Sequence, residues 1–314
     1  MAPSVVLLVV TALAVYAVNG NVVSDRSIQN KVSTTSFDDY VSRWRMMPLS
    51  GAAYSSDPQA CLDNVFGPST ATITKVINVK CDETPEDTCQ VFSGVNHMDK
   101  SIIISFRGSY GNQQILLEGV DSIFLKKMSW PTGGEVAHYF GNAFNMMWAE
   151  GLKDDLLALK NNYPDYKEIW FTGHSLGGAL ASLAAATIIH MGYASADNVV
   201  VYTQGEPRVG DHAYARGFDA LLKYDYRVVH KHDPIPHVPF ELKKLDYFHH
   251  KQEIWYDNDM STAQYTVCPG DESDNCSNRY LDLAPADHAI YYGKHMNDFG
   301  KNGCIGLSPP PPRS

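Results

Sequence analysis

The chain has 314 residues, of which 35 are acidic and 25 basic, so its formal net charge is −10 at pH 7. A chain of this length can bury the core of one large α/β domain. The acidic balance and the lack of a basic block argue against a nucleic-acid partner, and a negative surface is not attracted to anionic membranes.

The first twenty residues are predicted to be a signal peptide. Val5–Val18 is apolar and carries no charged side chain, a length that suits a secretory signal and is short for a membrane span. We expect cleavage after Ala17 or Gly20, although no Lys or Arg precedes the apolar run. An uncleaved membrane anchor is the alternative, and no other stretch approaches transmembrane length.

Six cysteines follow this segment. An even number behind a signal peptide favours disulfides, and six cysteines allow fifteen pairings. Short spacing favours Cys81–Cys89 and Cys268–Cys276, which leaves Cys61–Cys304 to join the start of the domain to its end. Asn275-Cys276-Ser277 is a glycosylation sequon, which makes Asn275 a possible site even though Cys276 lies in a predicted disulfide.

Strands and helices are predicted to alternate along one domain, residues 21–307. Ser36 is expected to cap the first helix, with Asp39 in capping-box position. In chain order, the pattern predicts a helix at 37–44, strands at 69–80, 90–97 and 101–107, a helix at 136–163, a strand, turn and helix within 167–187, a strand at 198–203, a helix at 212–222, strands at 226–230 and 249–256, and a helix at 286–295. This alternation predicts a mostly parallel sheet with helices on both faces, followed by a proline-rich tail at 308–314.

A serine occupies the glycine-rich turn between a predicted strand and a predicted helix. Gly173-His174-Ser175-Leu176-Gly177 fits the G-x-S-x-G nucleophile elbow, which exposes a serine hydroxyl beside backbone N–H groups. The pentapeptide alone is common by chance, and an ordinary glycine-rich turn is the alternative. The apolar run 169–171 before it and the helical spacing after it make Ser175 the candidate nucleophile.

An acid and then a histidine should follow such a serine along the chain. Asp233 comes directly after the predicted strand 226–230, and the prolines beside it stiffen the backbone that presents it. Asp211 and Asp225 are the competing acids. The histidines after Asp233 are His237, His249, His250, His288 and His295. We favour His288, because a late loop can swing back over the sheet edge.

Five segments, in this order and spacing, resemble the class 3 lipases, the fungal-lipase-like branch of the α/β-hydrolases, and most of all its secreted nematode members. The resemblance runs from about Tyr54 to Cys304 and is carried by FRGS (106–109), GHSLGGALASLAA (173–185), QGEPRVGD (204–211), VVHKHDPIPHVP (228–239) and DHAIYYG (287–293). It implies an α/β-hydrolase fold, with Ser175 as nucleophile, Asp233 as acid and His288 as base. It also implies that Ser109 and Leu176 donate to the oxyanion. The family often has Gln at the position of Glu206.

The segment after the oxyanion serine forms a lid in this family, and it corresponds here to Tyr110–Lys126. Its apolar residues would form one wide face of a helix, which suits contact with a lipid surface. A helix packed into the core is the alternative.

Metal binding is a weaker interpretation. His230-x-His232 and His249-His250 contain metal-ligand residues, but no carboxylate accompanies them at a matching spacing. We therefore expect no metal and no cofactor.

Together these observations predict a secreted, monomeric serine lipase that hydrolyses lipid esters, most directly triacylglycerols, at a lipid–water interface. A phospholipase, a carboxylesterase or a feruloyl-type esterase would share the fold, and a catalytically silent lipid-binding protein is the alternative from a different class. The complete set of Ser, Asp, His and Ser109 argues against silence.

Overall fold

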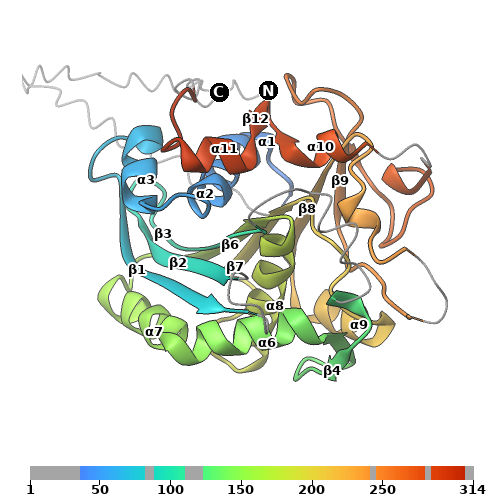
Figure 1. Ribbon diagram of the computed structural model, residues 1–314. Helices are drawn as coiled ribbons and strands as arrows, with labels where there is room; N and C mark the ends of the chain where they lie inside the picture. Colours follow the sequence, from blue (N-terminus) through green and yellow to red (C-terminus); the bar gives the residue numbers. More distant parts are fainter. Residues whose placement is uncertain (1–35, 82–87, 110–122, 241–244, 280–283, 308–314) are drawn as a thin grey trace, which may run out of the picture. The chain divides into compact units, whose positions relative to one another are not determined.

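The computed structural model describes residues 36–81, 88–109, 123–240, 245–279 and 284–307 (Figure 1), all of which belong to the unit formed by residues 32–314. The predicted signal peptide, the tail 308–314 and residues 110–122 of the predicted lid lie outside these ranges. Within them, no helix is both long enough and apolar enough to cross a membrane.

Eight of the described strands form one sheet, in the order β1-β2-β3-β6-β7-β8-β9-β10. The strands are β1 (Ala71–Lys80), β2 (Thr88–Asn96), β3 (Ser101–Phe106), β6 (Glu168–His174), β7 (Val199–Gln204), β8 (Tyr224–His230), β9 (Glu253–Tyr256) and β10 (Thr266–Val267). The strands from β3 to β9 pair in parallel, while β1, β2 and β10 pair antiparallel at the two edges. The sheet is therefore mostly parallel, as the sequence predicts.

Helices cover both faces of this sheet (Figure 1). On one face lie α6 (His138–Met147), α7 (Lys153–Asn162), α8 (Leu176–His190) and α9 (His212–Leu221). On the other lie α1 (Asp39–Val41), α2 (Met47–Ala52), α3 (Pro58–Phe66) and α11 (Met296–Lys301). Because both faces are covered, β3 and β7 are buried at every position, which explains why they read as continuous apolar runs.

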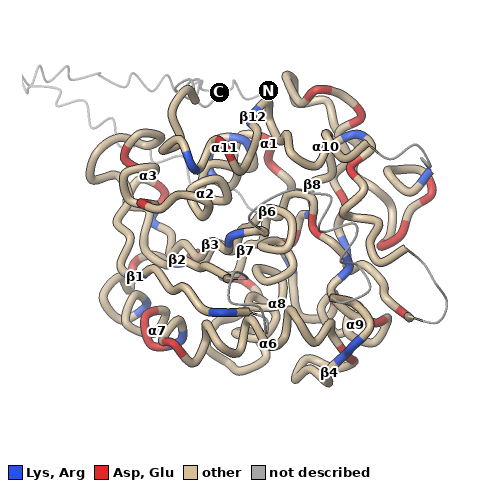
Figure 2. Tube along the Cα trace, in the orientation of Figure 1, with Lys and Arg blue, Asp and Glu red and all other residues tan. Residues whose placement is uncertain are grey.

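The helix α8 packs closely on the centre of the sheet. Small residues in α8 let that helix lie against β6 and β7, and its burial extends from Leu176 to Ile188. Figure 2 shows Lys and Arg as short, separate stretches of the described trace with acidic residues between them.

Three predicted helices have different boundaries in the structure. The predicted helix 136–163 begins as a strand, β5 (Glu135–Ala137), and Gly151, with a φ of 107°, breaks the helical backbone between α6 and α7. The first helix is capped by Asp38, which accepts from the N–H groups of Tyr40 and Val41, and not by Ser36.

The last of these predictions fails at the C-terminal end of the domain. The predicted helix 286–295 ends early, as α10 (Pro285–Ala289), and is followed by β11 (Ile290–Tyr291) and β12 (Lys294–His295). Tyr292 and Gly293 both have positive φ angles, which turn the chain into a hairpin that no helix can accommodate.

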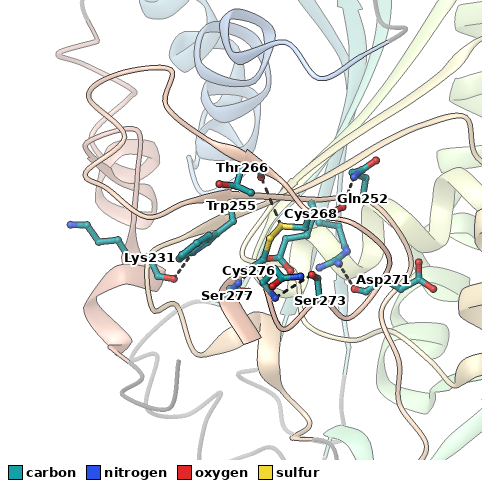
Figure 3. Close-up of a disulfide and its surroundings, with 12 residues drawn as sticks. Lys231, Gln252, Trp255, Thr266, Cys268, Asp271, Ser273, Cys276 and Ser277 are labelled. Carbon is teal, nitrogen blue, oxygen red and sulfur yellow. Dashed lines mark hydrogen bonds between the residues drawn. A yellow bond between two sulfur atoms is a disulfide. The ribbon is translucent and has the colours of Figure 1, made fainter. Parts of the chain in front are cut away.

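All six cysteines are in disulfides: Cys61–Cys304, Cys81–Cys89 and Cys268–Cys276. The first joins α3 to the chain beyond α11. The last holds a loop after β10, where Trp255 packs beside the sulfurs and donates from its indole N–H to the carbonyl of Lys231, 3.0 Å away (Figure 3).

The long-range disulfide should stabilise the domain most. It closes a separation of 243 residues, against 8 for each of the others, and the loop-entropy model assigns about 5.5 kcal/mol to the first and about 2.5 kcal/mol to each short loop. We expect the Cys61→Ser/Cys304→Ser double variant to lose more free energy of unfolding in urea than Cys81→Ser/Cys89→Ser. Equal losses would show that loop entropy does not govern this domain.

Candidate active site

Ser175 lies at the turn between β6 and α8, with a φ of 61° that a non-glycine residue seldom adopts. The neighbouring glycines make the turn possible. A Cβ at Gly173 would lie 2.2 Å from the carbonyl oxygen of Gly177, and a Cβ at Gly177 would lie 2.3 Å from that of Phe106. The Oγ of Ser175 is buried and has no hydrogen-bond partner among the described residues.

Asp233 follows β8 and is fully buried. Its Oδ1 accepts from the N–H of Ile235 at 2.8 Å, and its Oδ2 accepts from Nδ1 of His288 at 2.9 Å. Burial alone would raise the pKa of Asp233. The neighbouring His288, together with the hydrogen bonds to the carboxylate, holds that pKa below its ordinary value, so the group is ionised.

His288 lies in α10 and is 1% exposed. Because its Nδ1 donates to a carboxylate, Nε2 of the neutral ring carries the lone pair. This Nε2 is buried and unpaired in the described part of the chain. The arrangement gives the ring the tautomer that a general base needs.

The end of β7 lies against both the Ser175 turn and the Asp233–His288 pair. The N–H of Ser175 donates to the carbonyl of Gln204 at 2.8 Å. A Cβ at the next residue, Gly205, would lie 2.7 Å from Oδ2 of Asp233 and 2.8 Å from Nδ1 of His288. Two consecutive residues therefore touch the elbow on one side and the Asp–His pair on the other.

The predicted oxyanion donors flank the same turn. A Cβ at Gly108 would lie 2.6 Å from the carbonyl oxygen of His174 and 3.2 Å from Cβ of Ser175, so the chain reaches the nucleophile one residue before Ser109. Leu176 is the first residue of α8, and such an N–H has no acceptor within its own helix.

The competing acids and bases have other partners. Asp211 caps α9, accepting from the N–H of Tyr214. Asp225 lies inside β8, not before the strand as expected, and His250 comes before β9, which starts at Glu253. His237 donates to Asn278, His249 donates to the carbonyl of Pro236, and His295 is an exposed partner of Asp298.

Sequence reasoning missed Tyr291, whose hydroxyl donates to Oδ2 of Asp233 at 2.6 Å. Burial, and then the Asp233 charge, raises the pKa of Tyr291 well above its ordinary value, so its hydroxyl remains a donor. The spacing from His288 to Tyr291 was visible in the sequence, but nothing distinguished this tyrosine from a core residue.

A second buried charge cluster was also missed. Nδ1 of His250 is 2.8 Å from Oδ2 of Asp225, and its Nε2 is 3.0 Å from Oε1 of Glu206. All three side chains are at least nine-tenths buried. Burial by itself would lower the pKa of His250, but the two carboxylates raise it to about 10, so the ring is an imidazolium. Through these two contacts, His250 joins the loop after β7, which carries Glu206, to Asp225 in β8.

Of the histidines weighed as metal ligands, His249 donates to the carbonyl of Pro236, and His250 is held by Asp225 and Glu206. Among the described residues, only Glu253, Cys268 and Cys276 place three ligand atoms together, and both sulfurs are in a disulfide. A cysteine binds a metal ion as its free thiolate, which the disulfide removes, so this group does not fit a metal ion.

The described end of the predicted lid has two kinds of residue. Phe124 is buried and packs edge-on against Phe140 and Tyr247, whose hydroxyl donates to the carbonyl of Phe124. Leu125 is 63% exposed. The core-packed alternative therefore holds for Phe124, while Leu125 faces solvent.

Comparisons with known proteins identify the family of this chain. Residues 103–243 match the family model described as lipase (class 3). Lipase ZK262.3 of Caenorhabditis elegans is 35% identical over 291 residues, which cover 82% of this chain and 80% of that lipase. The chain belongs to the class 3 lipase family.

Solved lipase structures have the same α/β-hydrolase fold. The triacylglyceride lipase of Rhizomucor miehei superposes with a TM-score of 0.68 at 27% identity, covering 80% of this chain and 93% of the other. A triacylglycerol lipase whose catalytic centre is a serine protease triad superposes with a TM-score of 0.68 at 25% identity and the same coverage. This class 3 lipase is a serine ester hydrolase.

The His250 cluster should make stability depend on alkaline pH. The pKa of His250 is about 10 in the folded chain against an ordinary 6.5, so its contribution is fully present below pH 6.5 and is lost as pH rises towards 10. We expect the urea midpoint to fall over this range. In Glu206→Gln, which removes one carboxylate, the fall should be smaller and lie at lower pH.

Wild type and variant share all other titrating groups, so the difference between their pH curves reports the cluster. Identical pH dependence in the two proteins would show that Glu206 does not hold the proton on His250.

Proposed function

We propose that this protein is a secreted lipase that hydrolyses acylglycerols, most directly triacylglycerols, through Ser175, Asp233 and His288. One observation carries the proposal. The Asp233–His288 pair presents an unpaired, buried Nε2 at the strand ends that also hold Ser175 in an elbow conformation. The similar fold of a triacylglycerol lipase with a serine protease triad supports it.

In this mechanism, Oγ of Ser175 attacks the ester carbonyl while Nε2 of His288 takes its proton. Asp233 keeps the tautomer and stabilises the imidazolium. Ser109 and the N–H of Leu176 receive the oxyanion, and each such donor contributes about 3–4 kcal/mol to the barrier reduction. His288 then protonates the leaving alcohol and activates water, which releases the fatty acid and restores the serine.

The preference for water-insoluble esters rests on apolar surface. Leu125, which belongs to the apolar segment Tyr110–Lys126, is large and exposed. Exposed apolar side chains favour contact with lipid over water. The proposed substrate is therefore an ester held in a lipid phase.

Secretion completes the proposal. Three disulfides suit an oxidising compartment, and the apolar run Val5–Val18 suits a cleaved signal. Asn275 is exposed and accessible to a glycan. We propose that the secreted enzyme acts as a monomer, with no cofactor.

Replacing the nucleophile should abolish hydrolysis. For Ser175→Ala we expect kcat/KM on a soluble p-nitrophenyl ester to fall on the order of 10⁴-fold or more, because the remaining members of such a site act as a unit. Ser182→Ala is the matched control, since this buried serine lies in α8, the helix that directly follows Ser175. Activity retained by Ser175→Ala would overturn the mechanism.

A substrate panel tests the specificity. We expect the purified enzyme to hydrolyse emulsified triolein faster than phosphatidylcholine vesicles, and its rate on a short ester to rise when that ester exceeds its solubility. Titration of released fatty acid measures all three. Activity confined to dissolved short esters would identify a carboxylesterase, and preference for phosphatidylcholine would identify a phospholipase.

A further inference from the structure

Two consecutive backbone carbonyls beside the base are held by histidine side chains. Nε2 of His174 lies 2.8 Å from the carbonyl oxygen of His288, and Nδ1 of His230 lies 3.0 Å from that of Asp287. Both carbonyls belong to the last turn of α10, which ends at Ala289. The last carbonyls of a helix have no acceptor role within it, so these two are satisfied from outside.

The two imidazoles come from the ends of different strands. His174 is the last residue of β6, directly before Ser175, and His230 is the last residue of β8, three residues before Asp233. Both side chains are at least nine-tenths buried. The ring of His174 also stacks on that of His288, with centroids 4.6 Å apart. The base is thus tied to the rigid sheet next to both of its partners.

The hydrogen atoms in these contacts follow from the acceptors. A carbonyl oxygen can only accept, so Nε2 of His174 carries the proton, and its Nδ1 accepts from the hydroxyl of Tyr54 at 2.8 Å. In the same way, Nδ1 of His230 carries the proton. Its Nε2 is buried and has no partner within the described ranges.

His174 also stays neutral during the reaction. Burial first, and then the neighbouring His288, lowers the pKa of His174 to about 3. When His288 takes the Ser175 proton, no second imidazolium forms against its ring. A charged residue at this position would oppose the protonation that the mechanism requires.

We propose that His174 and His230 are positioning residues that fix the backbone of the catalytic base. The hydrogen bond to Asp233 holds one ring atom of His288, Nδ1, and the backbone of His288 has to be held by other contacts. The carbonyls of Asp287 and His288 lie on either side of Cα of His288, so holding both of them fixes Cα and directs Nε2 towards Ser175. This inference rests on the proposed roles of Ser175 and His288.

Paired substitutions test it. His174→Leu and His230→Leu remove the donors at similar volume, whereas His174→Gln and His230→Asn place an amide N–H where Nε2 and Nδ1 stood. We expect each Leu variant to lose about 10- to 100-fold in kcat on a soluble p-nitrophenyl ester, because small misplacements of a base have effects of this size. KM should change less than kcat, and the amide variants should recover most of the loss.

His97→Leu is the matched control, since His97 follows β2 and bonds to Tyr166; its kcat should equal that of the wild type. Unchanged kcat in both Leu variants, with Ser175→Ala inactive, would overturn the positioning role and leave the proposed function intact. An active Ser175→Ala would instead overturn the function itself.

Variants that fold poorly are covered by a further substitution. Tyr54→Phe keeps His174 but removes the donor that fixes its tautomer, and it should also lower kcat while the urea midpoint changes little. Loss of urea stability in Tyr54→Phe, with kcat per folded molecule unchanged, would show a purely structural role and overturn the inference.

Discussion

The backbone of Ser175 has a φ of 61°, a conformation that costs a non-glycine residue about 1–3 kcal/mol. The conformation persists because close packing of the surrounding backbone excludes other conformations of this turn. Gly173 and Gly177 lie too close to other backbone atoms to carry a Cβ, and Gly108 packs against Ser175 itself. The sheet, α8 and the strand end before Ser109 therefore meet closely at one strained turn, and the other residues of the candidate site lie around it.

Two buried histidines of this domain, His174 and His250, differ in protonation state. His174, beside His288, is kept neutral by burial, with a pKa of about 3, while His250 is kept charged by two carboxylates, with a pKa of about 10. Both histidines are buried to a similar degree, so burial does not decide between them. The partner decides: a carbonyl and a hydroxyl in one case, and Asp225 and Glu206 in the other.

Much of the fold was predictable because it depends on local spacing. Alternating and apolar runs gave β1, β2, β7 and β8 to within a few residues, and the elbow placed α8 directly after Ser175. The failures have local causes that the pattern hides. Gly151 interrupts the helical backbone without changing the spacing of the apolar residues around it. Tyr292 has a positive φ angle, which a tyrosine in the sequence does not indicate.

The sequence by itself determined the order of Ser175, Asp233 and His288 along the chain, the family to which they belong, and cysteine spacings that suit the three disulfides. Only the tertiary structure decided which polar groups meet. Tyr291 reaches Asp233 across 58 residues, His174 reaches the carbonyl of His288 across 114, and Glu206 reaches His250 across 44. Such pairs depend on strand register and on the angle at which α10 returns over the sheet. These are properties of packing, and no spacing within one segment encodes them.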